Sequence, residues 1–82
     1  MRTIWKYPLG RVLALPDGAR LIKVARQAGE LTLWALVDTE APLAPHHFEV
    51  CGTGHPAPPD SSYVGTVFDE PFVWHVFEVP QP

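Results

Sequence analysis

Apolar and polar residues alternate along most of this chain, and β-branched and aromatic residues occupy many of the apolar positions. Alternation with a period of two is typical of half-buried β-strands rather than helices. The pattern predicts strands at residues 3–7, 21–26, 31–37, 47–51, 63–68 and 72–79, and residues 11–15 are a further short candidate. Glycine and proline separate these segments at the turns. We therefore expect an all-β fold of about six short strands, as a single small antiparallel sheet or a barrel-like domain.

The clearest expected element is a β-hairpin between residues 20 and 38. Gln27 to Glu30 form its turn, where Gly29 suits a left-handed backbone conformation. Residues 31–37 are apolar on both faces, which indicates a central strand covered on both sides. A helix over residues 19–28 is the competing interpretation, but these residues form no long amphipathic stripe and no good N-cap precedes them. A connector is expected at 41–45 and a proline-rich loop at 57–62.

The chain is short and apolar for its size. Its 82 residues suffice for one β domain, spanning 1–82, with 46% hydrophobic and only 18% charged residues. A core this small is marginal, and the single cysteine, Cys51, excludes an intrachain disulfide. Apolar side chains in excess of what one small core can cover are typical of a subunit interface. We therefore expect a homo-oligomer, either a dimer or a tetramer.

The formal net charge of −3 at pH 7 argues against non-specific binding to duplex nucleic acid, which requires a basic face. Small anions are still compatible ligands, because backbone N–H groups and one or two cations can hold them. The longest apolar run, residues 31–37, is far shorter than a membrane span, so no membrane partner is expected. The first residues lack the hydrophobic segment of a signal peptide. These features together predict a cytoplasmic protein.

Residue types used in catalysis and metal binding are present, but none has a recognised arrangement. His47, Glu49 and Cys51 would share one face of a strand, yet their spacing fits no standard zinc pattern. Serine and aspartate at 60–62 fall in a flexible loop, and the adjacent carboxylates at 69–70 fall in a turn. We therefore expect no catalytic residues, no metal and no cofactor, and a protein that is not an enzyme.

A glycine-rich segment is the first feature that points to ligand binding. Gly52, Thr53, Gly54 and His55 follow a predicted strand, and successive N–H groups in such a turn can form an anion-binding nest. Thr53 would add a hydroxyl, and His55 would donate to a phosphate or stack on a base. The alternative is a plain tight turn closed by Pro56.

Aromatic side chains are the second such feature. Rings fall in predicted strands at Trp5, Tyr7, Trp34, Tyr63 and Trp74. Most such rings pack in a core, but five on one small sheet favour one or two that line a pocket, where each stacked base contributes about 1–3 kcal/mol. A cation for the ligand would come from Arg2, Lys6, Lys23 or Arg26, although basic residues on strands are usually solvated. The candidate ligand-binding residues are Trp5, Lys6, Trp34, Gly52, Thr53, Gly54, His55 and Trp74, with Trp34 expected to stack a base held by the loop.

Several blocks of sequence together resemble a known family. The most specific are Gly-Thr-Gly-His-Pro at 52–56 and Trp-His-Val-Phe-Glu at 74–78, and further blocks lie at 3–9, 15–19, 33–38 and 63–67. They resemble a large family of small phage-encoded proteins labelled as a domain of unknown function. Small phage proteins of this type are similar to the anti-CBASS and anti-Thoeris sponges, which sequester the nucleotide signals of bacterial defence without cleaving them.

This resemblance implies a non-catalytic, oligomeric binder of a small cyclic nucleotide in the host cytoplasm, with pockets between protomers. The proline-rich segment 41–45 and the Pro58–Pro59 loop depart from the pattern and leave open which nucleotide fits. Two other classes of function stay open. One is a protein–protein interaction inhibitor or accessory factor that docks through an aromatic face, and the other is a metal-dependent phosphoesterase with its metal near Cys51.

Overall fold

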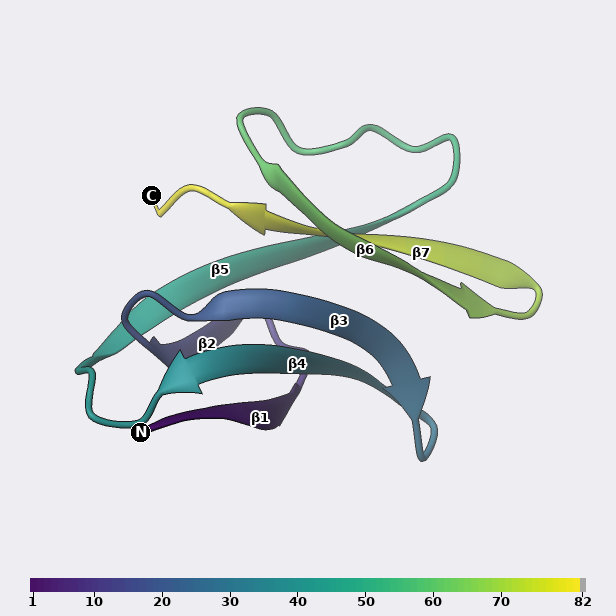
Figure 1. Cartoon of the computed structure of the whole chain (residues 1–82). Coiled ribbons are helices and arrows are strands. Elements are labelled where there is room, and N and C mark those ends of the chain that lie inside the picture. Colours follow the sequence, from purple (N-terminus) through teal and green to yellow (C-terminus); the bar gives the residue numbers. More distant parts are fainter. Residues whose placement is uncertain (82) are drawn as a thin grey trace.

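Two antiparallel sheets make up the computed structural model, which describes residues 1–81 (Figure 1). One sheet has the order β1-β4-β3, with β1 at Arg2–Pro8, β4 at Glu30–Asp38 and β3 at Arg20–Gln27. The other has the order β2-β5-β7-β6, with β2 at Val12–Pro16, β5 at Leu43–Gly52, β7 at Phe72–Val79 and β6 at Ser62–Asp69. The all-β, antiparallel prediction is confirmed, with seven strands divided between two sheets.

The predicted hairpin between β3 and β4 is confirmed. Its two-residue turn consists of Ala28 and Gly29, which both have positive φ angles of 50° and 80°. Two left-handed residues give a turn whose twist matches that of the paired strands. The competing helix over residues 19–28 is wrong, because residues 20–27 form β3 and pair along their length with β4. No helix long and apolar enough to cross a membrane occurs within residues 1–81.

Strand β4 is central in its sheet, as its apolar pattern predicted. Leu33, Ala35 and Val37 are buried on the face that meets the four-stranded sheet, while Trp34 and Leu36 on the other face are half-buried. The inner side chains pack with a core drawn from both sheets, which contains Leu15, Val24, Phe48, Val67 and Val76. The core therefore lies between the sheets, and the outer face of β4 is only partly covered.

The two sheets approach most closely where β3 passes β6. Each strand has an irregularity there, between Leu21 and Lys23 in β3 and between Tyr63 and Gly65 in β6. Val24 lies directly against Gly65, so close that a β-carbon on the glycine would be 2.6 Å from a Val24 methyl carbon. A glycine at this position leaves room for the Val24 side chain against the backbone of β6.

The prediction of a connector over residues 41–45 is wrong in part, because β5 already begins at Leu43. Pro45 pairs with Ala14 of β2, whereas the pairing of β5 with β7 starts two residues later, at His47. One side of β5 is thus open at Pro45, so the missing N–H of proline costs no ladder hydrogen bond. The other predicted strands match the structure within one or two residues.

Candidate functional site

The candidate site lies at the end of the four-stranded sheet where β5 leads into the glycine-rich turn. Gly52 pairs with Trp74, and Trp74 pairs in turn with Val67 on the other side of β7. Paired residues share a sheet face, and Trp74 is two positions from the buried Val76, so the indole is on the inner, core-side face. The half-buried indole thus lies next to Val76, the last buried residue of β7, toward the end of the sheet.

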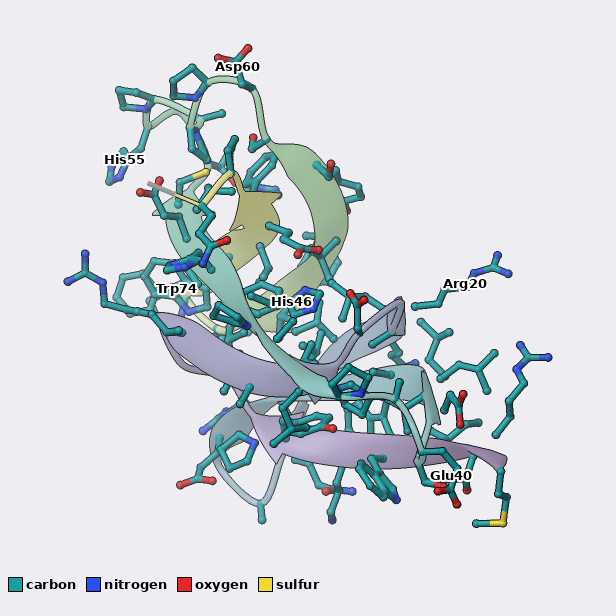
Figure 2. The ribbon with its side chains drawn as sticks, turned by 90° about the vertical axis from the view of Figure 1, so that its left-hand side faces the viewer. Arg20, Glu40, His46, His55, Asp60 and Trp74 are labelled. Atoms are coloured by element: carbon teal, nitrogen blue, oxygen red, sulfur yellow. The ribbon has the colours of Figure 1, made fainter. Side chains whose placement is uncertain are left out.

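A hollow of about 330 Å³ opens beside this indole, and its lining residues are Gly52, Thr53, His55, Pro71, Phe72, Val73 and Trp74. The rings of Phe72 and Trp74 are stacked, with centroids 5.2 Å apart and planes inclined by 22°. A β-carbon at Gly52 would lie 3.5 Å from His55 Nδ1 and 3.7 Å from Trp74 Cζ3. The bare glycine therefore leaves space that the imidazole and the indole border from two sides. Figure 2 shows His55 and Trp74 on the same side of the molecule.

A chain of polar contacts fixes the indole and adds a cation near the hollow. Trp74 Nε1 donates a hydrogen bond to Asp69 Oδ2 at 3.3 Å. The other carboxylate oxygen of Asp69 is 2.9 Å from the guanidinium of Arg26, whose side chain remains 52% exposed. Arg26 comes from β3 of the other sheet, so it brings a positive charge to the border of the site while it neutralises the carboxylate.

The glycine-rich segment is itself a tight turn. The N–H of His55 donates to the carbonyl of Gly52 at 3.1 Å, and Gly54 has a φ of 87°. A positive φ at the third of four residues is typical of a type II turn, which requires glycine there. The turn occupies the His55 N–H, so the predicted anion nest is reduced to the N–H groups of Thr53 and Gly54.

The Thr53 hydroxyl has a partner on the outer face of the sheet. Its Oγ1 shares a hydrogen bond with His75 Nε2 at 2.8 Å, and His75 Nδ1 shares another with Thr66 Oγ1 at 3.0 Å. The Thr66 hydroxyl also bonds the hydroxyl of Tyr63. Both imidazole nitrogens therefore have hydrogen-bond partners. His75 pairs with Cys51 in the β5–β7 ladder, but neither nitrogen is left to accept the proton of the Cys51 thiol. This arrangement gives no activated thiol, and within residues 1–81 no cluster of three or more His, Cys, Asp or Glu could hold a metal ion.

Comparison with protein families matches residues 1–82 to a domain of unknown function, DUF7352. The chain belongs to this family. Since the match covers the full length, the two-sheet fold and the hollow at Trp74 are features of a DUF7352 domain. Comparisons with curated proteins and with solved structures found no match.

The DUF7352 fold divides the predicted ligand-binding residues into two groups. The turn residues and Trp74 come together around the hollow. Trp5, Lys6 and Trp34 lie in the other sheet, where Trp34 faces away from the core in a row between Lys6 and Lys23. The structure therefore does not bring Trp34 to the loop, because its neighbours in β4, Leu33 and Ala35, are the residues that face inward.

Sequence reasoning missed Asp69 and Phe72 as parts of the site. The two residues pair directly across the β6–β7 turn, and Val67 pairs with Trp74 next to them. A register counted outward from the Glu70–Pro71 turn would have placed all four on the face of the indole. The alternating pattern alone predicted the two strands, but it did not show which of their residues share a face of the sheet.

Two larger hollows lie elsewhere, of about 470 and 510 Å³, and they adjoin at Arg11, Phe48 and Glu49. Both are lined by Arg11 and Glu49, and His47 lines the larger one. The smaller hollow at Trp74 is lined by a stacked aromatic pair together with an imidazole and residues of the glycine turn. It is the better candidate for recognition of a specific ligand.

Proposed function

We propose that this domain binds and sequesters a small cyclic nucleotide without cleaving it. The observation that carries the proposal is the hollow at Trp74, which combines a stacked aromatic pair with an imidazole and a glycine turn. A heterocyclic base needs an aromatic face, and its phosphate needs N–H donors and a cation. The Trp74 indole would supply the aromatic surface, the N–H groups of Thr53 and Gly54 and the His55 imidazole would supply donors, and Arg26, which is paired with Asp69, would supply the cation.

The shape of the site also supports a binder rather than an enzyme. Both nitrogens of His75 are engaged by threonine hydroxyls, and Asp69 is held by the Trp74 indole and Arg26. Neither partner of His75 is a carboxylate, which in a hydroxyl–histidine–carboxylate relay stabilises the charged imidazole, so this arrangement favours a role in holding a ligand over one in hydrolysis. At about 330 Å³ the hollow is near the lower limit for small-molecule sites, which agrees with a pocket completed by a second copy of the chain, as the resemblance to phage sponges implies.

The test is binding of cyclic dinucleotides and cyclic ADP-ribose isomers, measured by thermal shift and then by calorimetry. A ligand that binds only the folded state raises the melting temperature by mass action. We expect His55→Ala to weaken binding by roughly 10- to 150-fold, the equivalent of about 1.5–3 kcal/mol for a hydrogen bond to a charged group. The melting temperature of the ligand-free variant should barely change, because His55 is exposed.

Thr53 offers a matched pair of variants. Thr53→Val removes the hydroxyl and its bond to His75, and Thr53→Ser keeps both, so a loss of affinity confined to the valine variant would show that this bond positions the turn for the ligand. The bound nucleotide should be recovered intact after the protein is denatured. Recovery of a linear or dephosphorylated product, or unchanged affinity in the His55→Ala variant, would contradict the proposal.

A second candidate function is docking on another protein, and exposed rings on the β6–β7 hairpin favour it. Tyr63 and Phe68 are 62% and 75% exposed on the outer face of β6. Exposed rings on one sheet face are typical of protein interaction sites. Phe68 lies outside the hollow, so Phe68→Ser should leave nucleotide binding unchanged and abolish docking. Loss of nucleotide affinity in this variant would instead show that the rings belong to the ligand site or to an interface that completes it.

A further inference from the structure

Strand β1 is an open edge of the three-stranded sheet, because it pairs with β4 alone. The ladder bonds show which of its groups are free. The Thr39 N–H donates to the Met1 carbonyl at 2.8 Å, and the Leu9 N–H donates to the Leu31 carbonyl at 2.9 Å. Bonded pairs recur at every second residue of an antiparallel ladder, and this register has no shift, so the odd-numbered residues bond β4.

The backbone groups of the even-numbered residues therefore point away from the sheet. These are the N–H and C=O groups of Arg2, Ile4 and Lys6, while Pro8 ends the strand without an N–H. An edge with three consecutive free donor–acceptor pairs is a template for another strand. The site proposed at Trp74 belongs to the other sheet, so this edge is independent of it.

Apolar side chains flank the free edge on both sheet faces. Ile4 is 54% exposed on the outer face, and Trp5 is 41% exposed on the opposite face. A fourth strand beside β1 would cover both of them, since its side chains would also alternate between the faces. An added strand thus gains apolar contacts as well as backbone hydrogen bonds.

The charge of this region defines the chemistry of the added strand. Four of the six basic residues of this acidic chain lie in the three-stranded sheet on the face of Trp34, namely Arg2, Lys6, Arg20 and Lys23, and they outnumber the acidic residues there, of which Asp38 stands opposite Arg2. The Lys6 ammonium bonds only the neutral amide of Gln27, at 2.7 Å, so its charge is not compensated by that contact. A second copy of β1, paired so that all the free groups are used, would place Arg2 opposite Lys6, which is repulsive.

We propose that β1 accepts an extended segment of a partner protein as a fourth strand, with acidic side chains opposite Arg2 and Lys6 and an apolar one opposite Ile4. Main-chain hydrogen bonds would provide affinity, and the alternating acidic and apolar side chains would provide specificity. The acidic partner strand has the charge that the edge lacks, whereas a copy of this chain does not.

The probe is the capped peptide Thr-Glu-Val-Val-Val-Glu-Thr, titrated into the ¹⁵N-labelled protein and followed by NMR. We expect the amide signals of Arg2, Ile4 and Lys6 to shift most. The same peptide with lysine in place of both glutamates should bind about tenfold more weakly, because two favourable cross-strand charge pairs become repulsive. High salt should reduce this difference.

Backbone methylation of the peptide provides a matched control that leaves the protein unaltered. N-methylation of the central valine, opposite Ile4, should abolish binding, because its N–H points at β1 in the expected register. N-methylation of the adjacent valine, whose N–H points away, should be tolerated. Equal effects of the two methyl groups, equal binding of the lysine peptide, or no shift at β1 at millimolar peptide would each overturn the proposal. So would a concentration-dependent shift of these same amides in the free protein, since a second copy would then occupy the edge.

Discussion

The contact between Gly65 and Val24 makes a sharp prediction about how the two sheets are held together. Gly65→Ala would place a methyl group 2.6 Å from Val24 Cγ1, about 1 Å inside ordinary carbon–carbon contact. Val24 is only 7% exposed and belongs to the core, and a β-branched side chain has little rotational freedom with which to move away. The added methyl group must therefore push β3 and β6 apart.

The expected loss of stability is the balance of two effects. Overpacking of a well-packed core typically costs about 1–3 kcal/mol. Replacing glycine by alanine restricts the unfolded chain and returns about 0.4–1 kcal/mol where the backbone tolerates a side chain, and Gly65 does not have a left-handed φ. We therefore expect a net loss of up to about 2.6 kcal/mol, which for a domain of this size lowers the melting temperature by about 4–8 °C per kcal/mol.

Urea unfolding at a fixed protein concentration would measure this loss. Gly10→Ala is the matched control, because a β-carbon there would be 3.5 Å from its nearest neighbour, a Leu13 methyl carbon, which is ordinary contact. The decisive experiment is a double-mutant cycle, since Val24→Ala removes the clashing methyl group and should cancel the cost of Gly65→Ala. If Gly65→Ala is as well tolerated as Gly10→Ala, or equally harmful in the Val24→Ala background, the two strands do not meet as described.

Two further predictions concern titrating groups. The Tyr7 hydroxyl is buried without a hydrogen-bond partner in residues 1–81, and burial raises the pKa of Tyr7 above its ordinary 10.0; Tyr7→Phe should therefore be neutral or stabilising by about 1 kcal/mol at pH 7. In urea unfolding, the stability of the parent should fall as the pH rises above 10, because the folded state holds the Tyr7 proton more tightly than the unfolded state. This fall should be smaller in Tyr7→Phe. The pKa of Asp38 lies below its ordinary 3.8, chiefly because the Glu40 N–H donates to its carboxylate. The ionised carboxylate therefore stabilises the fold above the ordinary pKa, and this stabilisation is lost as the pH falls below it. Asp38→Asn should flatten this acid limb, and an unchanged limb would show that the contact does not stabilise the fold.

Much of the secondary structure followed from the sequence, because local chemistry decides it. Ala28 and Gly29 formed the expected turn, and the period of two in residues 31–37 correctly indicated a central strand. The start of β5 was missed because Pro45 signals a break, and a proline is compatible with a strand only where one side is unpaired. That condition depends on how far β7 extends, which no local pattern reveals.

The site was harder to predict, because strand register decides it. Of the predicted candidates, Trp74 and residues of the glycine turn lie together at one hollow, because Gly52 pairs with Trp74. Trp34 had the same residue type and a similar strand context, yet it lies on the outer face of the other sheet. An alternating pattern that is apolar on both faces, as in residues 31–37, does not indicate which face is turned inward.

Trp74 has the sequence pattern of a core position but lines the hollow, and the arrangement of the two sheets explains why. Trp74 lies on the inner face in line with Val76, which is fully buried, but the residues that line the hollow come from the four-stranded sheet and its loops. Among residues 1–81, none from the three-stranded sheet lines the hollow, although the Arg26 side chain reaches Asp69 from β3. An indole left in this position is covered on one side by Phe72 and is open on the other. The end of the core thus also provides a surface on which a flat ring can stack. We expect that extending β3 or β4 over this end of the four-stranded sheet would close the hollow.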